Sequence, residues 1–153
     1  MITMKKRLKI CAVGNSASIH VKKRTQCFAD LGHEVSLISP ARNLVDGIKN
    51  IYLPTHKNKP GLPGYIYRLI NAIRAENPDI VHLHYAEVYQ ITACYLSGFN
   101  FAVTLMGSDV MNGFGKLARP QKLLLASMLK KAALINPKSQ NIDAMVEHNI
   151  GKH

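Results

Sequence analysis

A histidine and a Gly-Ser-Asp turn follow two short apolar segments of this chain, and both positions suit the binding of a small polar ligand. Ile80–Leu83 and Phe101–Leu105 are too short for helices and rich in β-branched residues, so they predict buried strands. His84 follows the first segment, and Gly107-Ser108-Asp109 follows the second. The carboxyl ends of parallel strands form the ligand crevice of an open sheet. We therefore predict that an imidazole, a carboxylate and a tight turn meet on one rim.

His84 is the candidate for a catalytic group. An imidazole near neutral pH can orient a substrate hydroxyl or share its proton, and the alternative is a hydrogen-bonded histidine with a structural role. His82 lies two positions earlier, and we expect it to face the other side of the sheet and to be structural. Asp109 also has two interpretations, a contact to ligand hydroxyls or the N-cap of a helix.

A second group of candidates lies in the loop after the first predicted strand. Gly14, Asn15 and Ser16 can present backbone N–H groups and a helix N-terminus to a phosphate, whereas the alternative is a plain strand–helix turn. The loop is not a G-x-G-x-x-G motif, so dinucleotide binding has weak support. Lys138 and Ser139 follow the last predicted strand and are candidates for contacts to an acceptor or to a domain cleft.

Strands and helices alternate along the chain, which predicts an α/β fold with a mostly parallel sheet of about six strands and helices on both faces. The expected strands are Leu8–Val13, Glu34–Ser39, Ile48–Tyr52, Ile80–His84, Phe101–Leu105 and Ala133–Asn136. The expected helices are one that ends near Leu31 and others at Tyr65–Glu76, around Val88–Leu96, at Gln121–Lys131 and at Asn141–Asn149. Gly32 and Gly98 are the predicted stops of the first and third helices, and residues 55–63 are expected to form a loop.

Composition narrows the classes of partner. The chain has 153 residues, enough for one domain, and a formal net charge of +11, which favours an anionic partner. The cluster Lys22, Lys23 and Arg24 is the first choice for contacting an anionic ligand or lipid phosphate.

No segment approaches the roughly 18 apolar residues that span a bilayer, and the basic N-terminus lacks a signal-peptide core, so we expect a cytoplasmic protein. The three cysteines lack metal-ligand spacing, so we expect reduced core or half-buried thiols and no metal site.

Five segments, taken in order, resemble the N-terminal half of a GT-B glycosyltransferase of the large retaining family 4. They are Lys9–Gly14 before a helix, Leu31–Val35, Pro78–His84, Thr104–Asp109 and Ala133–Ser139 before an amphipathic helix, and together they cover most of the chain. The chain departs from the family pattern at Met106, where the family often has histidine, and in the first loop, which lacks a double glycine.

The resemblance implies that residues 1–153 form a single Rossmann-like domain that receives the acceptor, and His84 matches the family's active-site histidine. It also implies a nucleotide-sugar donor, which in this family is held by a C-terminal domain marked by two glutamates at a fixed spacing. The only glutamates here are Glu34, Glu76, Glu87 and Glu147, and none have that spacing. We therefore expect the donor-binding domain to be absent, the end of the chain to be a cut, and the chain alone to be inactive.

The function that the resemblance implies is retaining transfer of a sugar to a glycan or lipid-linked acceptor in the biosynthesis of cell-envelope polysaccharide. The alternative is a non-enzymatic binding module that docks a partner chain or an anionic membrane. The basic clusters allow peripheral contact with the inner face of the membrane. Nucleic acid is not an expected partner, because that hypothesis rests on charge alone and no recognised motif supports it.

Overall fold

The computed structural model describes residues 6–55, 61–85, 87–106, 117–137 and 139–150. Within these residues the strands are β1 (Lys9–Val13), β2 (Glu34–Ser39), β3 (Lys49–Tyr52), β4 (Ile80–His84), β5 (Phe101–Leu105) and β6 (Leu134–Pro137). The helices are α1 (Ile19–Asp30), α2 (Gly61–Glu76), α3 (Val88–Ser97), α4 (Arg119–Leu129) and α5 (Gln140–Ile150).

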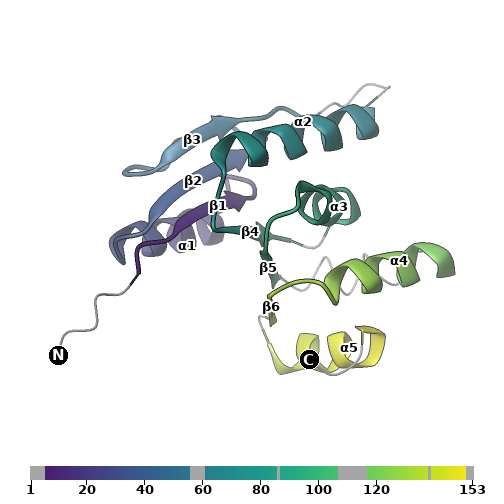
Figure 1. Cartoon of the computed structure of the whole chain (residues 1–153). Helices are drawn as coiled ribbons and strands as arrows, with labels where there is room; N and C mark the ends of the chain where they lie inside the picture. The colour runs from purple at the N-terminus through teal and green to yellow at the C-terminus, as the bar shows by residue number, and fades with distance from the viewer. Residues whose placement is uncertain (1–5, 56–60, 86, 107–116, 138, 151–153) are drawn as a thin grey trace.

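The six strands form one parallel sheet in the order β3-β2-β1-β4-β5-β6 (Figure 1). The strand order reverses between β1 and β4. The chain first adds β2 and β3 at one edge of β1, and it then returns to the other edge of β1 to add β4, β5 and β6. In open α/β sheets, ligands bind at the carboxyl ends of the strands on either side of such a reversal. The predicted fold class, a doubly wound Rossmann-like sheet with helices on both faces, is confirmed.

The helices cover the two faces of the sheet unevenly. Buried residues of α2, α3, α4 and α5 pack with alternate strand residues such as Cys11, Val81 and Val103 in one large core. Ala12 and Leu37 point to the opposite face, where they pack with Val21 of α1 in a small second core. Figure 1 shows α1 separated by the sheet from the other four helices. We refer to the two sides as the α1 face and the four-helix face.

The element boundaries agree with the prediction to within two residues except at the start of α2. That helix begins at Gly61 rather than Tyr65, so it includes Pro63. The first turn of a helix makes no use of the backbone N–H that proline lacks, so a proline there is compatible with the helix.

Both glycines that were predicted to end helices do so in a left-handed conformation. Gly32 follows α1 and Gly98 follows α3, each with φ 87°. The cysteines follow the prediction only in part, because Cys11 and Cys94 are buried but Cys27 is exposed. No helix among the described residues is long and apolar enough to span a bilayer.

Candidate functional site

A pocket of about 270 Å³ lies at the carboxyl rim of the sheet, where the strand order reverses. Asn15, which follows β1, and His84, which ends β4, both line it. We call this cavity the rim pocket, and its remaining walls are Ser18, Pro40, Tyr85, Glu87, Tyr89 and Gln90. His84 therefore lies at the predicted rim of the sheet, and its role in binding a ligand stays a prediction.

His84 is held in place by close packing behind its ring. Its side chain is only 2% exposed, and Nε2 has no hydrogen-bond partner among the described residues. A Cβ atom at Gly14 would lie 3.1 Å from the Cβ of His84 and 3.3 Å from the methyl groups of Val21. A larger residue at the end of β1 would thus crowd β4 and α1.

The electrostatic surroundings keep the His84 ring neutral. Burial, followed by the neighbouring His82 ring and the Arg24 guanidinium, lowers the pKa of His84 from 6.5 to about 2. A group with so low a pKa is a weak base at neutral pH. Of the two chemical roles predicted for His84, orienting a hydroxyl through a neutral nitrogen therefore suits this site better than carrying a proton.

The first turn of α3 supplies the other polar groups of the rim pocket. Gln90 is 7% exposed, and its Oε1 atom is buried without a hydrogen-bond partner in the described part of the chain. Burial and a hydrogen bond to Glu87 raise the pKa of Tyr89, so the phenol donates to the Glu87 carboxylate. Buried polar atoms without partners are rare, and His84 and Gln90, which both line the rim pocket, each carry one among the described residues.

Tyr85 links the strand to this turn in an unusual conformation. Its φ of 78° lies in the left-handed region, which is uncommon for residues other than glycine, although its backbone N–H still donates to the carbonyl of Thr104 at 3.1 Å. Strained residues of this kind concentrate at binding sites. The turn directs the chain over the end of β4 and so brings Glu87 and Gln90 to the rim pocket.

The loop after β1 uses most of its backbone donors internally. Four backbone N–H groups donate at 2.9–3.1 Å: Gly14 to the Ile38 carbonyl, Ser16 to Ser39 Oγ, Ala17 to Asn15 Oδ1, and Ser18 to the Asn15 carbonyl. Ser18 makes no side-chain cap, so the first N–H groups of α1 remain open to a ligand. A phosphate at this loop would thus be bound by the first turn of α1.

The structure places the remaining predicted site residues in different surroundings. Asn15 lines the rim pocket, but Ser16 is completely buried and its hydroxyl donates to the Ala41 carbonyl at 3.2 Å. Ser139 is exposed and caps α5, since its Oγ accepts from the N–H of Ile142 at 3.4 Å. The candidates Gly107, Ser108, Asp109 and Lys138 lie outside the described residues.

The prediction that His82 faces away from His84 is wrong. Residues two apart on a strand share a face, and the two imidazole rings lie 4.5 Å apart on the α1 face. His82 Nε2 lies 3.0 Å from Thr104 Oγ1, which also accepts a hydrogen bond from Arg24. Arg24 is therefore drawn onto the sheet, away from Lys22 and Lys23, with which it was predicted to bind an anion.

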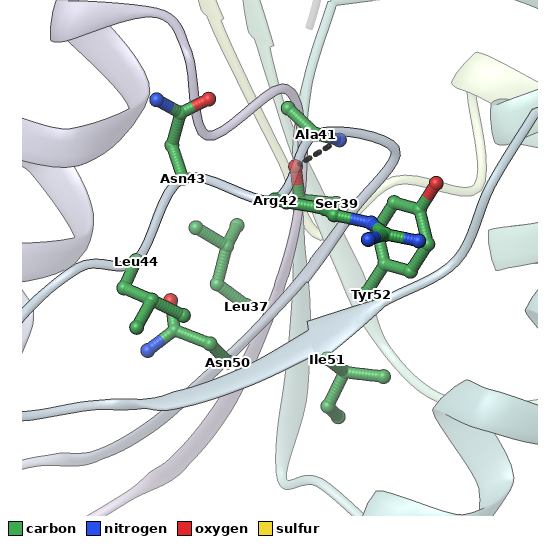
Figure 2. Close-up of a pocket in the computed structure, with 9 residues that line it drawn as sticks. All are labelled: Leu37, Ser39, Ala41, Arg42, Asn43, Leu44, Asn50, Ile51 and Tyr52. Carbon is green, nitrogen blue, oxygen red and sulfur yellow. Dashed lines mark hydrogen bonds between the residues drawn. The ribbon is translucent and has the colours of Figure 1, made fainter.

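A second cavity, of about 260 Å³, lies on the α1 face beside the edge strand β3 (Figure 2). The Arg42 guanidinium lies 4.8 Å from the centre of the Tyr52 ring, and the Ala41 N–H donates to Ser39 Oγ at 3.0 Å. Among the described residues this cavity has none of the predicted site residues in its lining. No group of three or more metal-ligating side chains occurs in the described ranges.

Sequence reasoning missed Tyr85, Glu87 and Gln90. These residues come directly after a predicted strand, but their residue types and spacing form no recognised motif. The left-handed turn at Tyr85 and the burial of Gln90 depend on the packing of α3 over the sheet, and a single sequence does not contain that information.

Two solved structures are similar to this chain in fold. One is a Listeria monocytogenes protein assigned as a UDP-N-acetylglucosamine 2-epimerase, with a TM-score of 0.69 and 18% identity over 97% of this chain and 44% of that one. The other is sucrose-phosphate synthase from Thermosynechococcus elongatus, with a TM-score of 0.72 and 13% identity over 96% of this chain and 46% of that one. This chain thus spans less than half of either protein.

No curated protein matches the sequence significantly. The profile of the family described as Glycosyl transferase 4-like matches residues 9–140, which include β1 to β6 and the residues of the rim pocket. The resemblance to the N-terminal domain of a GT-B glycosyltransferase is confirmed, and the chain belongs to the glycosyl transferase 4-like family.

Proposed function

We propose that this chain is the acceptor-binding half of a retaining glycosyltransferase that moves a sugar from a nucleotide-sugar donor to a glycan or lipid-linked acceptor. The observation that carries the proposal is that two residues lining one pocket at the reversal of strand order, His84 and Gln90, each have a buried polar atom without a partner among the described residues. The family supports glycosyl transfer in general, and the rim pocket supports binding of the acceptor.

The chemistry of the rim pocket suits a hydroxylated ring. Gln90 Oε1 and the Glu87 carboxylate accept hydrogen bonds, and the neutral His84 ring adds a nitrogen that can hold a hydroxyl in line for reaction. Among the described residues, the lining contains no lysine or arginine. Hydroxyl groups donate to such acceptors, whereas an anionic group would face the Glu87 carboxylate without a lysine or arginine in that described lining to balance it.

Retaining transfer also needs stabilisation of the leaving phosphate of the donor. In this proposal a second domain with the donor site performs that role, in agreement with the short span of this chain relative to the similar structures. We expect that the isolated chain binds acceptor but does not turn over any nucleotide sugar.

The experiment that tests the proposal is ligand-observed NMR on the purified chain with a panel of methyl hexosides. We expect saturation transfer to at least one hexoside, its loss in Gln90→Leu and His84→Ala, and no change in the control His20→Ala, which is exposed on α1. In a preparation that includes the donor domain, His84→Ala should lower transfer by about 10²-fold. Binding that is the same in all three variants, or absent for every hexoside, contradicts the proposal.

We also propose peripheral contact with the inner, anionic face of the membrane. Arg24 is occupied on the sheet, so the start of α2 becomes the favoured surface, where Leu62 is 55% and Tyr67 66% exposed near Arg68. Flotation with acidic vesicles tests this proposal: binding should occur at low salt and weaken at high salt. Absence of binding at low salt contradicts it.

A further inference from the structure

The cavity in Figure 2 shares a wall with the rim pocket. It has a volume of about 260 Å³ and lies at the carboxyl ends of β2 and β3. Pro40 lines the rim pocket, whereas its chain neighbours Ser39 and Ala41 line this second cavity. We call it the Arg42 cavity. A ligand that extends past Pro40 from the rim pocket can therefore reach it.

Internal hydrogen bonds hold the walls of the Arg42 cavity in place. Ser39 Oγ accepts from the N–H groups of Ser16 and Ala41 at 2.9 and 3.0 Å, and it donates to Ser16 Oγ at 2.9 Å. The Asn50 side chain accepts from the N–H of Val45 and donates to the Val45 carbonyl, both at 2.9 Å. These bonds tie the segment between β2 and β3 to the sheet. A ligand thus meets a pre-formed cavity, which reduces the entropy lost on binding.

Arg42 gives this cavity a positive charge that no described side chain neutralises. Among the described residues no aspartate or glutamate forms an ion pair with it, and Arg42 is the one charged residue of the described lining. Its guanidinium lies 4.8 Å from the centre of the Tyr52 ring, and this cation–π contact holds it in one place (Figure 2). A guanidinium pairs with two oxygens of a carboxylate or a phosphate at once, so the cavity suits an anionic group.

The two cavities differ in charge, and together they match a ligand with two parts. The described lining of the rim pocket includes the Glu87 carboxylate and no lysine or arginine, so it suits a neutral hydroxylated ring. The described lining of the Arg42 cavity has a guanidinium and no carboxylate. An anionic group is repelled by Glu87 on one side of Pro40 and attracted by Arg42 on the other. A ligand that fits both cavities has a neutral ring joined to an anionic group.

We propose that the acceptor carries a carboxylate or phosphate next to the sugar that receives the transferred unit, and that Arg42 binds this anionic group. The position of the acceptor sugar in the rim pocket rests on the proposed function, whereas the charge preference of the Arg42 cavity rests on its own residues. Arg42 selects acidic acceptors over neutral ones, and Tyr52 positions its guanidinium.

The test compares charged and neutral ligands of the same shape. The probes are a methyl hexoside that carries a hexuronic acid residue, the methyl ester of this disaccharide, and a methyl hexoside phosphate. Their dissociation constants are measured by NMR titration of the purified chain. We expect the acid to bind about tenfold more tightly than its ester, because the guanidinium adds a charge-assisted pair of hydrogen bonds. Tighter binding of the phosphate than of the acid also supports the proposal and identifies phosphate as the anionic group.

Matched variants locate the charge that the acid contacts. Arg42→Gln should remove the difference between acid and ester and leave the affinity for the ester unchanged, whereas Arg42→Lys should keep part of the difference. The control Arg7→Gln removes the same charge at an exposed position before β1, at the opposite end of the strands, and should keep the full difference. If neither the acid nor the phosphate binds more tightly than the ester to the parent chain, or if both glutamine variants have an equal effect, the proposal is overturned.

Failure of this proposal and failure of the proposed function give different results. If the ester binds and neither anionic probe gains affinity over it, only the charge preference of Arg42 is wrong. If no probe binds, both proposals are wrong. If acid binding depends on Arg42 but is unchanged in Gln90→Leu, the Arg42 cavity is an anion site separate from the acceptor sugar, and the proposal is overturned.

Discussion

Acid should destabilise this protein through two buried histidines that face each other on the α1 face. Burial, followed by the Arg24 charge, lowers the pKa of His82 to about 4, and His84 has a pKa of about 2. In the unfolded chain both rings titrate near 6.5. Below that pH the unfolded state binds more protons than the folded state, so the free energy of unfolding falls as the pH falls.

The size of the effect follows from this difference in proton binding. Each histidine removes about 1.4 kcal/mol per pH unit once the pH is below the unfolded pKa. Between pH 7 and pH 5 the loss is about 2 kcal/mol for each ring and about 4 kcal/mol for the pair. The contribution of His82 should level off near pH 4, where the folded state also takes up its proton.

Urea unfolding followed by far-UV circular dichroism between pH 7 and pH 5 measures this loss. The double variant His82→Gln, His84→Gln has no titrating ring at these positions and should lose most of its pH dependence. His20→Gln, at an exposed position on α1, should keep the pH dependence of the parent chain. If the double variant is destabilised by acid as much as the parent chain, the buried rings do not control the acid response.

Three further substitutions test the packing and the rim pocket. Gly14→Ala should lower the free energy of unfolding by about 1–3 kcal/mol, because the new methyl group would lie 3.1 Å from His84 Cβ. The control Gly64→Ala adds a methyl group with nothing within 4 Å and should be tolerated in the same urea titration. Gln90→Leu should remove hexoside binding and raise the melting temperature in calorimetry, because the variant loses a buried acceptor without a partner. A lower melting temperature would contradict the unpartnered state of Oε1. Asn50→Ala should lower the free energy of unfolding by about 1–3 kcal/mol, because this side chain makes three hydrogen bonds of 2.9–3.1 Å within the β2–β3 connection. An unchanged urea midpoint would show that the connection does not need these hydrogen bonds.

The sheet was predictable because its strands are short apolar segments separated by clear stop residues. Three strands, β2, β4 and β5, have the predicted bounds, and the other three agree with the prediction to within one residue at each end. The start of α2 was not predictable from composition, since Gly61 and Pro63 are typical of loops. They are compatible with a helix here because they lie in its first turn, where the backbone N–H that proline lacks is not needed.

The candidate site was predictable only where one strand end determines it. His84 follows from the position of β4, but the error over His82 came from the assignment of residues two apart to opposite faces. The involvement of Arg24 with Thr104, 80 residues later, and the burial of Gln90 arise from tertiary packing. The roles of Gly107-Ser108-Asp109 and Lys138 stay predictions.

The position of β1 between β2 and β4 has a consequence for synthesis on the ribosome. β2 can pair with one edge of β1 as soon as it emerges, but the other edge must wait for β4, which begins 70 residues after Ile10, its register partner. About 45 residues separate the ends of β2 and β4, and at 5–20 residues per second they take about 2–9 s to translate. For that interval the nascent chain presents an unpaired strand edge, which is a template for pairing with other chains. We expect chaperone dependence of this protein to be concentrated in those seconds, and slower translation between Ser39 and Ile80 to increase its aggregation.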